Sequence, residues 1–170
     1  VCEQQLVDAA DFALRSDQFY ADYQSGDLDI DAYLRFALGT LAGRPPAELD
    51  AWHNAFMATK ITPILLPKAA DLLADHRRRG HELLIITATN RFITAPIAAA
   101  LGVDNLIACD AEIIDGVYTG APSGVPSFQA GKVTRLHDWL LNCDHSLDGA
   151  WFYSDSHNDL PLLELVDNPV

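Results

Sequence analysis

Residues 82–86, Glu82-Leu83-Leu84-Ile85-Ile86, form a short apolar run, and the polar sequence Thr87-Ala88-Thr89-Asn90-Arg91 follows at once. A short apolar run bounded by polar residues is typical of a strand buried on both faces of a parallel sheet. The apolar spacing on either side favours helices. The first covers Lys68–Arg79 and ends at Gly80, and the second has Thr94 as its cap, Pro96 in its first turn and Gly102 at its end.

Strand and helix patterns continue to alternate downstream. The expected elements are a strand at Leu106–Cys109, a hairpin at Glu112–Thr119 around Asp115-Gly116, a loop at Gly120–Gly131, a helix at Lys132–Leu141 and a strand at Ala150–Tyr153. This order predicts an α/β fold with a doubly wound parallel sheet.

The first 59 residues have a different character, because their apolar residues recur at helical spacing and none alternates as in a strand. Breaks fall at Ser25-Gly26 and at Gly43-Arg44-Pro45-Pro46, where glycine and proline allow the chain to reverse. We therefore predict a small helical subdomain ahead of the sheet.

The composition limits the class of partner. The formal net charge is -13, from 24 acidic and 11 basic residues, which argues against nucleic acid or an anionic membrane as a partner and favours a small ligand. Cys2, Cys109 and Cys143 have no disulfide or metal spacing and are expected to be reduced thiols. No apolar run approaches the roughly 20 residues of a membrane span, and no leader pattern is present, so we expect a cytoplasmic location. The sequence does not predict the oligomeric state.

A second polar cluster follows the last predicted strand. It reads Ser154-Asp155-Ser156-His157-Asn158-Asp159. Because ligands bind beyond the carboxyl ends of parallel strands, Asp155 and Asp159 are expected to converge there on a hard cation such as Mg²⁺. The alternative is that Asp155 begins a turn and that Asn158 or Asp159 caps a helix.

Three elements in this order resemble the haloacid dehalogenase superfamily, in particular its phosphoserine-phosphatase-like branch. Residues 154–159 are similar to the fourth motif, Gly-Asp-x-x-Asn-Asp, with serine for the leading glycine. Thr87 at the end of an apolar strand is similar to the second motif, and Lys132 at the start of a helix is similar to the third. The resemblance implies a Rossmann-like core at residues 67–170 and a small helical cap at residues 1–66.

The resemblance also implies a role for each residue. Thr87, Ala88 and Lys132 are expected to bind phosphate, Asp155 to bind Mg²⁺, and Lys132 with Asp159 to act in catalysis, Asp159 by orienting the lysine or metal-bound water. Candidates for substrate contacts are Thr89, Asn90, Arg91 and Asn158, together with Arg35, Trp52 and His53 in the cap.

The nucleophilic aspartate of the first motif has no counterpart on a strand. Asp27-Leu28-Asp29-Ile30-Asp31 has a similar spacing, but it follows a polar helical segment and is expected to cap a helix. It also lacks the glycine and glutamate that a calcium loop requires. We therefore expect the nucleophile upstream of Val1 and a further strand beyond Val170, so that this chain alone would be catalytically silent.

The predicted function is a magnesium-dependent phosphomonoester hydrolase that acts through an aspartyl-phosphate on a small phosphate ester. The sequence Thr87-Ala88-Thr89-Asn90 resembles a bacterial group described as histidinol-phosphate or phosphoserine phosphatases. Two alternatives stay open, a non-catalytic small-ligand-binding protein on the same fold and a phosphotransferase.

Overall fold

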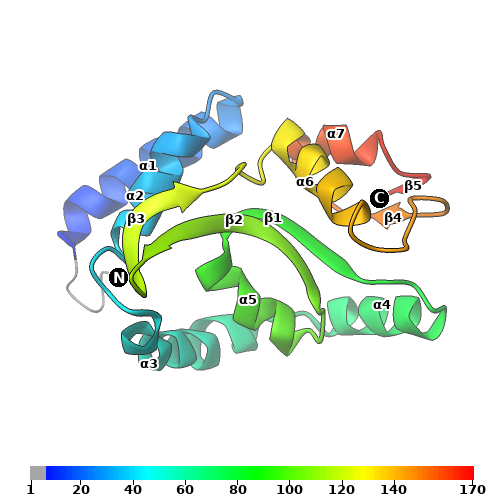
Figure 1. Ribbon diagram of the computed structural model, residues 1–170, viewed down its shortest axis with the longest axis horizontal. Coiled ribbons are helices and arrows are strands. Elements are labelled where there is room, and N and C mark those ends of the chain that lie inside the picture. Colours follow the sequence, from blue (N-terminus) through cyan, green and yellow to red (C-terminus); the bar gives the residue numbers. More distant parts are fainter. Residues whose placement is uncertain (1–6) are drawn as a thin grey trace.

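The computed structural model describes residues 7–170, so Cys2 lies outside the described residues (Figure 1). The longer helices are α1 (Ala9–Ser25), α2 (Ile30–Gly39), α3 (Pro46–Phe56), α4 (Pro67–Arg78), α5 (Arg91–Ala100) and α6 (Ala130–Leu140). Shorter helical turns are η1 (Met57–Ile61), η2 (Thr62–Ile64), η3 (His157–Asp159) and α7 (Leu160–Leu163). The strands are β1 (Leu84–Asn90), β2 (Asn105–Ile114), β3 (Val117–Ser123), β4 (Trp151–Phe152) and β5 (Asn168–Pro169).

The sheets confirm the predicted α/β class. β1 and β2 run parallel, and β4 and β5 form a second parallel pair. β2 and β3 are antiparallel, joined by a two-residue turn at Asp115 and Gly116 whose φ angles of 52° and 77° suit a tight hairpin. Helix α5 lies on one side of the three-stranded sheet and α6 on the other (Figure 1). The predicted hairpin is therefore confirmed, and it adds an antiparallel strand to the parallel pair.

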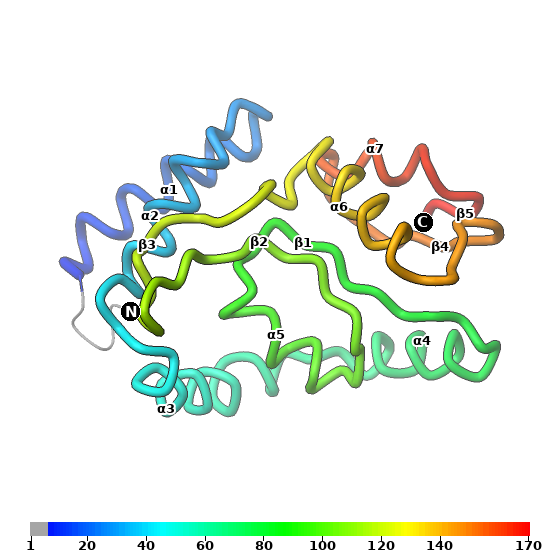
Figure 2. Tube along the Cα trace, in the orientation of Figure 1, coloured from blue at the N-terminus to red at the C-terminus, as the bar shows by residue number. Residues whose placement is uncertain are grey.

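The segment before α4 is helical, as predicted. Gly26, in a left-handed conformation with φ 85°, ends α1, and Pro45 directly precedes α3. Leu34, Leu38 and Leu49 of these helices are buried in one cluster with Cys109 of β2. Figure 2 shows α1 and α2 next to β3 at one end of the molecule, with α6 and α7 toward the other end. Helices and sheet therefore share a core at this end, and the division into cap and core stays a prediction.

A cleft separates the two sheets. β1 pairs with β2 and β4 pairs with β5, and a cavity of about 520 Å³ lies where β1 and β4 both contribute walls. We call this cavity the β1–β4 cleft. Its lining is largely apolar and includes Leu73, Leu84, Ile86, Leu136, Leu147 and Phe152.

Helix α5 begins earlier than its sequence predicts. β1 continues through the polar residues to Asn90, which pairs with Cys109 of β2. The Asn90 side chain then caps α5 by accepting from the Ile93 amide at 3.1 Å. The prediction of Thr94 as the cap was wrong, because Thr94 lies inside the helix and donates its hydroxyl to the Asn90 carbonyl at 3.1 Å.

Two other boundaries differ from prediction. The expectation of a further strand only beyond Val170 was wrong, because Asn168 and Pro169 already form β5 beside Trp151 and Phe152 of β4. The predicted loop at 120–131 is shorter, since β3 extends to Ser123. Both differences arise from pairing with a neighbouring strand, which the polar and proline-containing local sequences do not reveal.

Candidate active site

A buried ion pair forms the centre of the site. Lys132 Nζ donates to Asp159 Oδ1, and each side chain is only 8% exposed. The other carboxylate oxygen, Asp159 Oδ2, accepts the hydroxyl of Ser154 at 2.7 Å. Two of the residues predicted to act together therefore meet, and both oxygens of Asp159 have donors.

The loop before α6 fixes the position of Lys132. A Cβ added at Gly131 would lie 2.1 Å from the carbonyl oxygen of Pro126, so only glycine allows this close approach. Gln129, just before the helix, adopts φ 44° and ψ −123°, a strained conformation for a residue with a side chain. The start of α6 is thus held tightly against the preceding loop.

Residues 154–159 are cross-linked by short hydrogen bonds. The Ser156 amide donates to Ser154 Oγ at 3.1 Å, and the Asn158 amide donates to Ser156 Oγ at 3.3 Å. Asn158 is buried, and its Oδ1 accepts from Gln129 Nε2 at 3.0 Å. This last bond connects the two loops that carry Lys132 and Asp159.

Asp155 differs from Asp159 in its surroundings. Its side chain is exposed, and no hydrogen bond or ion pair joins it to another residue within 7–170. Within the same range, no three acidic, histidine or cysteine side chains gather closely enough to hold a metal ion by themselves. The donor set therefore fits a cation held by one carboxylate with the remaining oxygens from water and ligand, an arrangement that Mg²⁺ accepts.

The predicted phosphate-binding residues lie at the carboxyl end of β1. Thr87 to Asn90 are all half-buried, including Ala88. The Thr89 amide donates to Thr87 Oγ1 at 3.1 Å, which orients the threonine hydroxyl. The Asn90 side chain is used in capping α5, so its candidate role in substrate binding stays a prediction.

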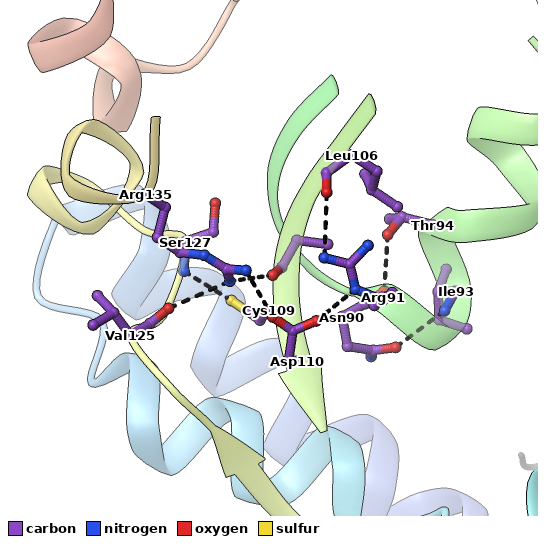
Figure 3. Close-up of polar contacts among 11 residues, drawn as sticks. Asn90, Arg91, Ile93, Thr94, Leu106, Cys109, Asp110, Val125, Ser127 and Arg135 are labelled. Carbon is purple, nitrogen blue, oxygen red and sulfur yellow. Dashed lines mark hydrogen bonds and ion pairs between the residues drawn. The ribbon is translucent and has the colours of Figure 1, made fainter. Parts of the chain in front are cut away.

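Arg91 belongs to a cluster centred on Asp110 (Figure 3). Arg91 Nε donates to Asp110 Oδ1 at 2.5 Å, and Arg91 Nη2 donates to the Leu106 carbonyl at 3.2 Å. Arg135, one turn along α6 from Lys132, donates to Asp110 Oδ2 at 2.6 Å. Asp110 therefore ties the start of α5 and the middle of α6 to β2, and the role of Arg91 in binding a substrate anion stays a prediction.

The cap candidates lie apart from each other. Arg35 is exposed, Trp52 is half-buried beneath the Arg44 guanidinium, and His53 stacks on Phe92 with ring centroids 4.4 Å apart. Burial of the ring lowers the pKa of His53. A second cavity of about 320 Å³ lies beside His53 and Phe92. No contact in residues 7–170 joins these side chains to Lys132, so their substrate role also stays a prediction.

The described cysteines are free thiols, as expected. Cys109 is buried, accepts the Ser127 amide at 3.2 Å (Figure 3), and has its pKa raised by burial. Asp29 accepts the Ala32 amide at 3.0 Å at the start of α2, which confirms that this acidic segment caps a helix.

Sequence reasoning missed several residues of the site. Ser154 was noted only as a replacement for glycine, although its hydroxyl holds Asp159. Gln129 and Tyr23 were not considered, and Tyr23 hydrogen-bonds to Ser156 at 2.5 Å. Serine in place of glycine was the one available signal, because the other contacts join segments far apart in the chain.

The helices of residues 7–170 include none that is long and apolar enough to cross a membrane. The fold and the site together define an α/β protein in which a buried lysine at the start of α6 is paired with an acidic residue of the loop that follows β4. The chain belongs to the haloacid dehalogenase-like hydrolase family, whose pattern it matches over residues 3–164.

Two relatives extend this assignment. A histidinol-phosphatase of Neisseria meningitidis serogroup C (strain 8013) is 45% identical over 169 residues, covering 97% of this chain and 76% of the relative. A phosphoserine phosphatase of Mycobacterium tuberculosis (strain ATCC 25618 / H37Rv) is 32% identical over 142 residues, which is 84% of this chain and 46% of that protein.

Solved structures show the same fold. A crystal structure of a protein of unknown function from Bordetella pertussis Tohama I matches with a TM-score of 0.87 and 45% identity, over 95% of this chain and 74% of that one. A substrate-bound phosphoserine phosphatase complex matches with a TM-score of 0.66 and 18% identity, over 90% of this chain and 70% of that one. The latter similarity concerns the fold alone.

Proposed function

We propose that this chain is the larger part of a magnesium-dependent phosphomonoester hydrolase for a small phosphorylated amino acid or amino alcohol. The observation that carries the proposal is the pairing of buried Lys132 with Asp159, next to the exposed carboxylate of Asp155. A buried ammonium group and an available carboxylate are what phosphoryl transfer needs, since its catalysis consists of positioning and charge neutralisation. The names of the two relatives support histidinol phosphate or phosphoserine as the substrate.

Each residue of the site then has a defined role in the proposed reaction. Asp155 would hold Mg²⁺, which supplies positive charge at the phosphoryl oxygens. Thr87 and the adjacent backbone N–H groups donate to the same oxygens. Lys132 neutralises charge on the nucleophile and the phosphoryl group, and Asp159 with Ser154 holds the lysine in place.

The nucleophile of the proposed reaction is an aspartate on a strand outside these 170 residues. The β1–β4 cleft supports this, because its lining is largely apolar and both β1 and β4 contribute to its walls. A parallel strand in the cleft would end near the loops that follow β1 and β4, where polar side chains gather. Its terminal aspartate would attack phosphorus as the ester P–O bond breaks, and the leaving oxygen would take up a proton and depart as the alcohol. Water would then hydrolyse the aspartyl-phosphate to inorganic phosphate and the free carboxylate.

The test uses the extended protein, meaning this chain with the residues encoded upstream of Val1. We expect it to release phosphate from histidinol phosphate or phosphoserine only when Mg²⁺ is present, and Asp155→Asn to abolish release. Asp104→Asn, which changes an exposed acid outside the β1–β4 cleft, is the control. A folded extended protein that releases phosphate from no ester in a broad panel would refute the enzyme and favour a binding protein. Transfer of phosphate to an alcohol in preference to water would identify a phosphotransferase.

A further inference from the structure

Helix α1 reaches the candidate active site through Tyr23. The Tyr23 hydroxyl lies 2.5 Å from Ser156 Oγ, although 133 positions separate the two residues. The Tyr23 ring is also near two neighbouring rings, with centroids 6.5 Å from Phe128 and 6.1 Å from His157. Tyr23 therefore contacts both the loop that precedes Lys132 and the loop that carries Asp155.

The backbone around Tyr23 is well fixed. Gly26 adopts φ 85° and its amide donates to the Tyr23 carbonyl at 3.3 Å, while the Asp27 amide donates to the Asp22 carbonyl at 2.9 Å. These bonds close the last turn of α1. Elsewhere α1 is exposed or half-buried along its length, and its aromatic rings pack on Phe36 of α2. Tyr23 thus has a defined position at the end of a lightly buried helix.

A path of hydrogen bonds runs from Tyr23 to Lys132. Ser156 Oγ meets the tyrosine hydroxyl, and the Ser156 amide donates to Ser154 Oγ at 3.1 Å. Ser154 Oγ donates to Asp159 Oδ2 at 2.7 Å, and the other oxygen of Asp159 binds Lys132. Asp155 lies between two serines that both belong to this path, so the path restrains the backbone on either side of it.

We propose that Tyr23 is a positioning residue that couples the docking of α1 to the order of the loop carrying Asp155. The proposal rests on the function proposed above, in which Asp155 holds the metal ion. When the tyrosine hydroxyl holds Ser156, the loop is ordered before the cation binds, and the cation does not have to order it. When α1 moves away, this restraint is lost. Metal affinity at the site therefore depends on a helix that contributes no ligand.

Hydrogen exchange of the extended protein tests the coupling without reference to activity. Tyr23→Phe removes only the hydroxyl, and we expect the amides of Ser156 and Asn158 to exchange about three to ten times faster. Ser156→Ala removes the acceptor of the Asn158 amide itself, so its effect is compared only at the amide of residue 156, whose acceptor Ser154 Oγ remains. At that amide Ser156→Ala should have a similar effect, and the double variant should exchange no faster than either single variant. Tyr20→Phe, at a tyrosine of the same helix that is 63% exposed, is the matched control. Unchanged exchange in Tyr23→Phe, or single effects that multiply in the double variant, would overturn the coupling.

A magnesium titration of the same variants tests its consequence. We expect the half-saturating Mg²⁺ concentration of Tyr23→Phe to rise about three- to tenfold, while KM for the ester at saturating Mg²⁺ stays within about twofold. If Tyr23→Phe lowers the stability of the protein but leaves its Mg²⁺ titration curve unchanged, Tyr23 has a structural role only. The proposal then fails. If the unaltered extended protein shows no magnesium-dependent turnover, the proposed function fails instead, and the exchange experiment still decides the coupling.

Discussion

Lys132 and Asp159 form an ion pair in which each side chain is only 8% exposed. Burial of two opposite charges costs desolvation energy, which their attraction and additional hydrogen bonds must offset. The pair is therefore sensitive to the loss of one partner, because the other is then left charged in a poorly solvated place.

Lys132→Met should accordingly affect both stability and turnover. We expect the free energy of unfolding to fall by about 3 kcal/mol, since Asp159 loses its counter-charge. Turnover by the extended protein should fall by about 10² to 10³-fold. Urea unfolding and phosphate release measure the two effects. Lys68→Met, at an exposed lysine, should change neither, and wild-type turnover in Lys132→Met would remove the lysine from the proposed mechanism.

Gly131→Ala tests the close approach that positions Lys132. The added Cβ would meet the Pro126 carbonyl at 2.1 Å, so the loop must move away from α6. We expect a loss of about 1–3 kcal/mol in unfolding free energy and reduced turnover, since a small displacement of a catalytic group is costly. Gly39→Ala is a matched control, because nothing lies within 4 Å of its added Cβ. Because Gly39 is the last residue of α2, that change should alter the free energy of unfolding by less than about 1 kcal/mol.

The acidic segment at residues 27–31 should prove structural. Asp29 caps α2, and asparagine caps a helix about as well as aspartate. The double variant Asp27→Asn, Asp29→Asn should therefore retain both stability and turnover to within a few-fold. Asp29→Ala removes the cap and should cost about 1 kcal/mol in unfolding free energy. Complete loss of turnover in the asparagine variant, with the fold intact, would mean that these carboxylates take part in the reaction.

The surroundings of His76 indicate how the free energy of unfolding depends on pH. It is buried, its Nε2 lies 2.9 Å from the Tyr153 hydroxyl and its Nδ1 lies 2.8 Å from Nδ1 of His81. Burial, followed by the nearby charges of His81 and Arg79, lowers its pKa below the usual value near 6.5. The unfolded chain thus binds a proton at this histidine more readily than the folded chain does. The contribution of His76 to the free energy of unfolding is therefore fully present above about pH 6.5 and is lost as the pH falls below that value.

Urea unfolding between pH 5.5 and 8 measures this effect. The free energy of unfolding should decline below about pH 6.5, and His76→Gln should make the decline shallower. His53, whose pKa is also lowered by burial, contributes in the same direction and accounts for part of the remaining slope. His137→Gln, at an exposed position of α6, is the control for the substitution itself. An equal slope in His76→Gln and the unaltered protein would contradict the assignment.

Much of the fold could be predicted because its cues are local. Apolar spacing identified α1 to α4 and α6, and Asp115-Gly116 identified the hairpin, since a two-residue turn of this kind needs positive φ at both positions. The end of β1 could not be predicted in this way. Its polar residues are extended because Asn90 pairs with Cys109, a neighbour that the local pattern does not contain.

The site was predictable to the extent that it follows a motif. Lys132 and Asp159 were expected to act together, and they meet in the structure. The residues that support them were not predicted, because their partners lie far away in the chain. Gln129 reaches Asn158 across 29 positions and Tyr23 reaches Ser156 across 133, and neither spacing leaves a pattern in the sequence.

The β1–β4 cleft has a consequence for handling the chain. Strand edges without a partner are templates for pairing with another molecule, and an apolar lining strengthens such contacts. The net charge of -13 opposes this association, because copies of the chain repel each other. Salt screens that repulsion. Association of these 170 residues therefore depends on two opposing effects, pairing at the strand edges and repulsion between acidic surfaces. Raising the ionic strength weakens the repulsion and favours aggregation.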